Sequence, residues 1–132
     1  MNKLFYPAVF HIAEEGGFWV EFPDIPECFT QGEDMQKAYE MAVEALGLSL
    51  STMEDAKETL PKASVPEKIE TGAGFLVVIE FDMMEYRRKH CSRAVKKTLS
   101  IPEWLNEAAV RENLNFSKVL QEALMVRLGI SR

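Results

Sequence analysis

A short stretch near the C-terminus constrains the fold most, because it has the pattern of a β-strand with no partner strand nearby. Residues 96–102 alternate polar and apolar side chains and end in a proline. In an extended strand the polar side chains share one face: Lys96, Thr98 and Ser100. The apolar ones share the other face: Val95, Leu99 and Ile101. A lone strand leaves backbone groups and an apolar face without partners, so we expect it to pair with the same strand of a second copy.

The residues after this strand carry a resemblance. Pro102 is followed by an amphipathic stretch, a polar break at residues 113–115, and Phe116-Ser117-Lys118 opening a second helical pattern. This order resembles a ribbon-helix-helix DNA-binding domain. The resemblance implies that the paired strands read the major groove through Lys96, Thr98 and Ser100. It also implies that the second helix holds a phosphate at its N-terminus through Ser117 and Lys118.

The same resemblance implies a dimer core and a special turn. The dimer core would be made by Leu99, Ile101, Leu105, Leu120 and Leu124. The glycine that the family usually has between the two helices is absent here. We expect Asn115 to replace it, since asparagine tolerates the left-handed backbone conformation better than most residues.

Charge is divided unevenly along the chain. Residues 1–86 hold 5 Lys and Arg against 17 Asp and Glu, a balance of −12, whereas residues 87–132 hold 10 against 4, a balance of +6. Arg87 begins a basic stretch, and no acidic residue occurs between Glu85 and Glu103. We interpret residues 87–94 as a basic linker that also touches the phosphate backbone of DNA; the alternative is a solvated, flexible linker.

The first 32 residues predict a β-hairpin and a short third strand. Residues 4–12 and 18–22 are rich in aromatic and aliphatic side chains and flank a Glu-Glu-Gly-Gly turn. Alternation in the second strand puts Phe18, Val20 and Phe22 on the core face, and Trp19 and Glu21 on the opposite face. Residues 28–30 form the third strand.

A long helix and a fourth strand complete the predicted N-terminal domain. Asp34 is a suitable N-cap for a helix that runs through Leu46 and beyond. Residues 75–81 are apolar enough to predict a strand in the middle of the sheet, whereas Pro7 predicts that the first strand lies near an edge or a bulge. The fold class is therefore α+β: a sheet of three to four strands with one long helix on a face. The predicted domains are 1–86, the linker 87–94, and 95–132.

The N-terminal residues carry a second resemblance. Tyr6-Pro7, the turn Phe22-Pro23-Asp24-Ile25-Pro26, and Thr30-Gln31-Gly32 before the helix are similar to the HicB family of antitoxins. Members of that family join such a domain to a C-terminal ribbon-helix-helix or helix-turn-helix. Glu27 departs from the pattern, because the family usually has glycine there.

This resemblance implies a type II antitoxin. Its partner would be a small basic HicA-type toxin that cleaves messenger RNA through a catalytic histidine, and its second ligand would be operator DNA bound by a homodimer or a higher assembly. An acidic domain suits a partner that binds RNA, since opposite charges steer the two together. The candidate toxin-binding residues cluster around the hairpin: Glu14, Glu15, Trp19, Glu21, Asp24 and Glu27.

Two other hypotheses compete with this one. A ligand-sensing repressor would use the same tail, with a cavity lined by Trp19 and the methionines at 35, 41, 83 and 84. An enzyme is disfavoured, because Glu21 and Asp24 have no histidine or glycine-rich phosphate loop placed to complete a site.

Metals, cofactors and membranes are not expected. His11, Cys28, His90 and Cys91 suffice in number for zinc but not in spacing, so we expect no metal, no cofactor and two reduced thiols. No apolar run has the length of a membrane span and no leader segment is visible, so we expect a cytoplasmic protein.

Overall fold

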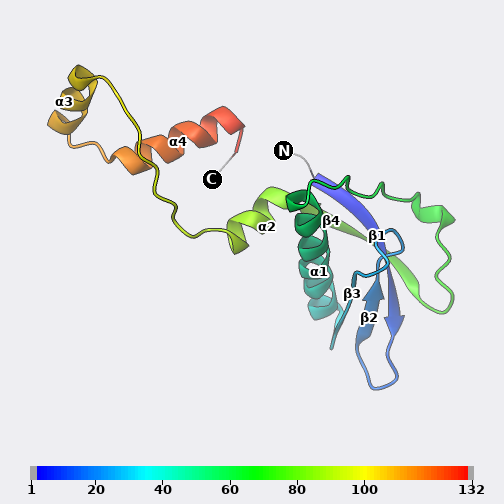
Figure 1. Ribbon diagram of the computed structural model, residues 1–132. Helices are drawn as coiled ribbons and strands as arrows, with labels where there is room; N and C mark the ends of the chain where they lie inside the picture. The colour runs from blue at the N-terminus through cyan, green and yellow to red at the C-terminus, as the bar shows by residue number, and fades with distance from the viewer. Residues whose placement is uncertain (1–2, 131–132) are drawn as a thin grey trace. The chain divides into compact units, whose positions relative to one another are not determined.

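The computed structural model describes residues 3–130, which divide into two compact units (Figure 1). The first unit extends to Ser92 and the second begins at Arg93. The first unit contains a sheet with a long helix packed on one face, so the α+β prediction is confirmed. The second unit contains two helices.

The sheet has four antiparallel strands in the order β3-β2-β1-β4. These are β1 (Lys3–Ile12), β2 (Phe18–Glu21), β3 (Phe29–Gly32) and β4 (Phe75–Asp82). The prediction that residues 75–81 lie in the middle of the sheet was wrong, since β1 is central and the apolar β4 is an edge strand. Pro7 fits inside β1 because pairing with β2 begins only at Val9, so at Pro7 the strand has β4 as its one neighbour.

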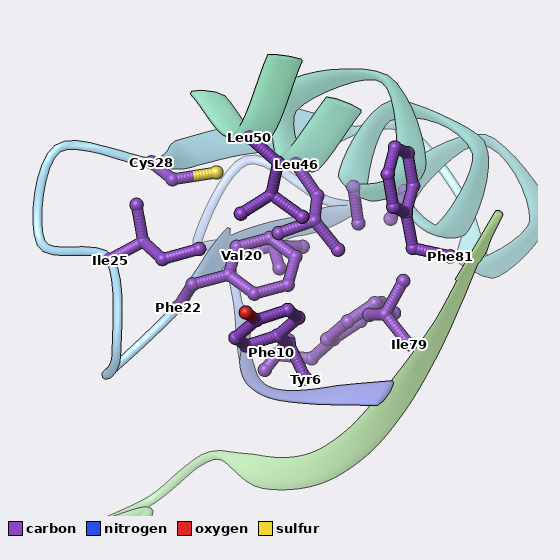
Figure 2. Close-up of a cluster of buried hydrophobic side chains, with 13 residues drawn as sticks. Tyr6, Phe10, Val20, Phe22, Ile25, Cys28, Leu46, Leu50, Ile79 and Phe81 are labelled. Atoms are coloured by element: carbon purple, nitrogen blue, oxygen red, sulfur yellow. The ribbon is translucent and has the colours of Figure 1, made fainter. Parts of the chain in front are cut away.

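Helix α1 (Met35–Asp55) covers one face of this sheet, and the hydrophobic core lies between them (Figure 2). Asp34 caps the helix as predicted: its Oδ1 accepts a hydrogen bond from the Lys37 amide at 2.7 Å. Gly32 lets the helix approach, because a Cβ on it would lie 2.3 Å from the Ala38 nitrogen. The buried side chains of this core cluster are Tyr6, Ala8, Phe10, Val20, Phe22, Ile25, Cys28, Ala38, Ala42, Leu46, Leu50, Ile79 and Phe81.

Two segments follow α1 in the first unit. The chain between α1 and β4 is irregular except for a 3-10 turn, η1 (Pro66–Lys68). After β4 the chain turns directly into α2 (Met83–His90), which is capped by Asp82. The predicted boundary at residues 86 and 87 falls inside α2, so residues 87–90 of the predicted linker are helical here.

The second unit contains α3 (Glu103–Arg111) and α4 (Phe116–Leu128). Asn113, with φ of 55°, adopts the left-handed conformation that ends α3, and the Asn113 and Leu114 amides donate to the carbonyls of Val110 and Ala109. The expectation for Asn115 was therefore wrong. Its φ is −87°, and its side chain caps α4 by accepting from the Lys118 amide.

The predicted strand at residues 95–101 has no regular secondary structure in this single chain. Its pairing needs a second copy, so the ribbon stays a prediction.

Candidate functional site

The six candidate residues around the hairpin fall into separate groups. Glu14 and Glu15 lie on the exposed turn between β1 and β2, and Glu27 lies on the exposed loop between β2 and β3. Trp19 and Glu21 lie on β2, on the sheet face that points away from α1. The structure places Trp19 and Glu21 side by side on one face of the sheet. Glu14, Glu15 and Glu27 lie outside the strands, on the turn and the loop.

Trp19 and Glu21 form a cluster with His11, which lies opposite Trp19 on β1. The imidazole stacks on the indole, with ring centroids 3.9 Å apart and ring planes 14° apart. His11 Nε2 lies 2.6 Å from Glu21 Oε2. The indole is still 43% exposed. Strand geometry thus fixes a half-exposed aromatic ring next to a carboxylate.

From the sequence, His11 was considered as a possible zinc ligand, and its part in this cluster was missed. The signal was available in the hairpin. A turn at residues 13–17 pairs His11 with Trp19, and alternation then places His11, Trp19 and Glu21 on one face.

The same sheet face carries exposed apolar side chains. Phe29, the cross-strand neighbour of Glu21 on β3, is 70% exposed, and Phe5 and Val78 are about half exposed. Exposed apolar groups beside a rigid aromatic ring are typical of protein interaction surfaces.

Both carboxylate oxygens of Asp24 accept hydrogen bonds from another residue of the first unit, Ser64. Its Oδ2 accepts from the Ser64 amide at 2.9 Å, and its Oδ1 accepts from the Ser64 hydroxyl. These bonds join the loop after β2 to the chain that follows α1. Asp24 therefore has a structural task, and a substitution there would disturb two loops as well as a surface charge.

Three basic residues of α2 pair with carboxylates of α1, whereas Arg88 pairs with Glu85 of α2 itself. Lys89 Nζ lies 2.6 Å from Glu44 Oε1, and His90 Nε2 lies 2.9 Å from Glu44 Oε2. The hydrogen bond from Lys89 lowers the pKa of Glu44, and the bond from His90 adds to this. Arg87 Nη2 lies within 3.0 Å of both Glu54 Oε1 and Asp55 Oδ1. The positive charges of Arg87 and Lys89 are thus neutralised within the first unit.

The predicted DNA-binding residues are all exposed to solvent in the single chain. Lys96, Thr98 and Ser100 are exposed, and so are Ser117 and Lys118 in the first turn of α4. The five residues of the predicted dimer core are also partly or largely exposed in the single chain. Neither α3 nor α4 contains a buried residue.

An open pocket of about 480 Å³ lies at the end of the hairpin, beside the start of α1. Met41 lines it, but Trp19 and the other methionines named for a ligand-sensing cavity do not. Its rim includes Glu15, Glu33 and Lys37.

The two cysteines and two histidines do not form a cluster that could hold a metal ion among the described residues. Cys28 is buried in the core, and this burial raises the pKa of its thiol, whereas Cys91 is exposed. Across residues 3–130 no group of three or more His, Cys, Asp or Glu side chains is arranged to hold a metal ion. In the same range no helix is both long enough and apolar enough to cross a bilayer.

Comparison with known proteins identifies the family. The sequence model described as HicB-like antitoxin of bacterial toxin-antitoxin system matches residues 6–123, which includes both units. The chain belongs to this family. HicB-like antitoxins are a family of antitoxins rather than of enzymes.

A curated relative and two solved structures agree with this assignment. Antitoxin HicB 1 of Photorhabdus laumondii is 43% identical over 61 residues, which cover 46% of this chain and 39% of the relative. The match therefore spans about two fifths of that relative's length. A toxin-antitoxin complex from Streptococcus pneumoniae contains a chain with a TM-score of 0.62 and 25% identity, covering 96% of this chain and 99% of that one. A chain of the HicA3 and HicB3 toxin-antitoxin complex has a TM-score of 0.50 and 26% identity, covering 60% of this chain and 99% of that one.

Proposed function

We propose that this chain neutralises a small basic toxin of the HicA type by covering its RNA-binding and catalytic surface, and that it represses its own operon as a dimer. Family membership over residues 6–123 carries this proposal. Two of the similar structures are toxin-antitoxin complexes, which supports a toxin as the partner.

The charge of the first unit supports the choice of partner. Residues 1–86 carry a balance of −12. An RNA-cleaving toxin must present positive charge to its substrate, so an acidic surface can compete with RNA for the same face. Pairing with α2 engages Glu44, Glu54 and Asp55 on α1. The carboxylates of the hairpin lie outside that cluster.

The second unit supports a dimer. Neither of its helices buries a side chain, and Leu99, Leu105 and Leu124 are each more than 40% exposed. A segment of about 40 residues with no buried side chain cannot hold a fixed fold by its own core. Docking of two copies through residues 95–101 would bury these leucines and pair the strand. The exposed polar face of that ribbon would then place Lys96, Thr98 and Ser100 in the major groove.

Toxin neutralisation is tested by rescue of growth. Bacteria that express the toxin encoded beside this chain should arrest, and co-expression of the chain should restore growth and yield a stoichiometric complex. Glu21→Lys should impair rescue, because it reverses charge on the open sheet face. Glu107→Lys, on α3, is the matched control, since it makes the same reversal in the second unit. Toxin that arrests growth equally with and without the chain would refute this half of the proposal.

DNA binding is tested on the region upstream of the chain's own operon. Lys96→Ala should weaken binding to every sequence and reduce the slope of log K against log salt by about 1.8 for a dimer, because each phosphate that is no longer neutralised lowers the slope by about 0.9. Thr98→Ala and Ser100→Ala should mainly relax base preference. Leu99→Asp should yield a monomer in sedimentation and abolish binding. Binding that is indifferent to all four changes would exclude the ribbon as the reader.

A further inference from the structure

The stacked cluster on the open face of the sheet fits a particular kind of contact. We propose that Trp19, Glu21 and His11 form a preformed socket for one arginine side chain of the toxin. This proposal rests on the proposed antitoxin function and names the chemistry of the contact. Trp19 and Glu21 would touch the arginine, and His11 would act as a positioning residue.

Among the described residues, His11 is the one aromatic ring that stacks on the indole, and it covers one face. The two rings are nearly parallel, with their centroids 3.9 Å apart. Because His11 lies on β1, the second face of the indole is turned away from β1, toward β3, where the exposed Gln31 is the cross-strand neighbour of Trp19. Trp19 as a whole residue remains 43% exposed. A guanidinium group stacks on such a face through cation–π and dispersion forces, and does so best on tryptophan.

The carboxylate of Glu21 supplies the charge for the same cation. One oxygen, Oε2, is held by His11 Nε2 at 2.6 Å. Among the residues that the structure describes, Glu21 has no other ion-pair partner, and its side chain is 45% exposed. The second oxygen can therefore accept from a guanidinium that lies over the indole. The planar fork of arginine can make both contacts at once, which the point charge of lysine cannot.

The surroundings favour a protein partner over other cations or anions. Nucleic acid would be repelled by the −12 balance of residues 1–86. A small ligand would need a concave site, and the open pocket at the hairpin end is lined by neither Trp19 nor Glu21. Phe29 beside Glu21 adds an exposed apolar wall that can exclude water when a second protein covers the face. An aromatic anchor surrounded by groups that exclude water is the arrangement of an interface hot spot.

The cluster can be altered without touching the core. Trp19, Glu21 and His11 project from the face opposite α1, whereas Val20 of β2 and Tyr6, Ala8 and Phe10 of β1 project toward it. Pro7 and Val9 of β1 are buried on the same face as His11. Substitution of Trp19 should therefore change binding more than folding. Trp19→Phe retains an aromatic face and serves as the conservative variant.

The test uses the full chain with Trp104→Phe, so that Trp19 is the sole indole. The probe is the HicA-type toxin encoded beside the chain, inactivated at its catalytic histidine, and affinity is measured by calorimetry. Trp19→Ala should weaken binding by about 30-fold or more, as expected for a hot-spot residue. Glu21→Gln should weaken it by about tenfold, and Trp19→Phe by less than Trp19→Ala. The matched control Glu70→Gln removes the same charge from an exposed loop between η1 and β4 and should change affinity by about twofold at most.

Fluorescence and toxin variants complete the test. Emission of Trp19 should shift to the blue when toxin binds, because the indole loses water. One arginine of the toxin, replaced by lysine, should show a coupling with Trp19→Ala in a double-mutant cycle.

The outcomes separate the two proposals. A tight complex in which Trp19 emission is unchanged and Trp19→Ala binds normally would overturn the socket and leave the antitoxin function standing. Equal losses for Glu21→Gln and Glu70→Gln would also overturn it, since they would indicate a general charge effect. Absence of any complex with the unmodified chain would instead overturn the proposed function itself.

Discussion

Replacement of Gly47 by alanine tests whether the Tyr86 ring docks α2 on α1, in addition to the ion pairs between the two helices. Gly47 lies in the buried part of α1, and a Cβ at this position would lie 2.3 Å from both Cδ1 and Cε1 of Tyr86. The Tyr86 ring is not free to swing away, since it also packs against Phe81 and His90, with centroids 5.8 Å and 4.4 Å apart. The added methyl group must therefore displace the ring, and α2 with it.

Two opposing terms set the magnitude of the Gly47→Ala effect. Alanine in place of glycine inside a helix gains about 1 kcal/mol. Overpacking against the Tyr86 ring costs about 1–3 kcal/mol. The net expectation is a loss of about 1 kcal/mol in the free energy of unfolding of the first unit. In a Tyr86→Ala background the clash is absent, so the same substitution should stabilise by about 1 kcal/mol.

The assay is urea unfolding followed by Trp19 fluorescence in a Trp104→Phe background, so that it reports on the first unit alone. Four proteins are compared: the parent, each single variant and the double variant. The sign of the Gly47→Ala effect should reverse between the two backgrounds. If Gly47→Ala stabilises both backgrounds equally, Tyr86 does not lie on Gly47 and the docking of α2 is wrong.

Two further predictions concern ionisable groups of the first unit. The hydrogen bond from Lys89 lowers the pKa of Glu44, so docking of α2 should be fully stabilised above the ordinary glutamate pKa. That stabilisation should be lost as pH falls through the lowered value, measured as smaller protection factors for amide exchange in α2 after correction for the intrinsic exchange rate at each pH. Glu44→Gln should remove this pH dependence of the protection factors. The exposed Cys91 should react with a thiol reagent in the native protein, whereas burial and its raised pKa should protect Cys28 until urea is added. Two fast-reacting thiols in the native protein would contradict the placement of Cys28.

Local features of this fold could be predicted from the sequence, because their causes are local. Asp34 caps α1 through an amide three residues away. Alternation in β2 correctly separated Val20 and Phe22, which are buried, from Trp19 and Glu21. Each of these depends on a few neighbouring residues, which is the range over which propensity and periodicity act.

The features that could not be predicted depend on residues far apart in the chain. The order of the strands depends on which edge of β1 receives β4, and the apolar character of residues 75–81 gives no information about that choice. Asp24 and Ser64 meet across 40 residues. The basic run beginning at Arg87 has the composition of a solvated linker, and only the α1 carboxylates, more than 30 residues earlier, make it a docked helix.

The docking of α2 on α1 also reduces the number of positive charges that remain available to bind DNA. Arg87 and Lys89 were counted from the sequence as part of a DNA-facing basic stretch, but both pair with carboxylates of α1. If α2 stays docked on α1 when the protein binds DNA, the positive charge available to phosphates begins at Arg93. Arg87→Ala should then leave the salt slope of operator binding unchanged. Lys96→Ala should reduce that slope by about 1.8 per dimer. An equal reduction for Arg87→Ala would mean that α2 leaves α1 when DNA binds, because one guanidinium cannot serve Glu54 and a phosphate at full strength together.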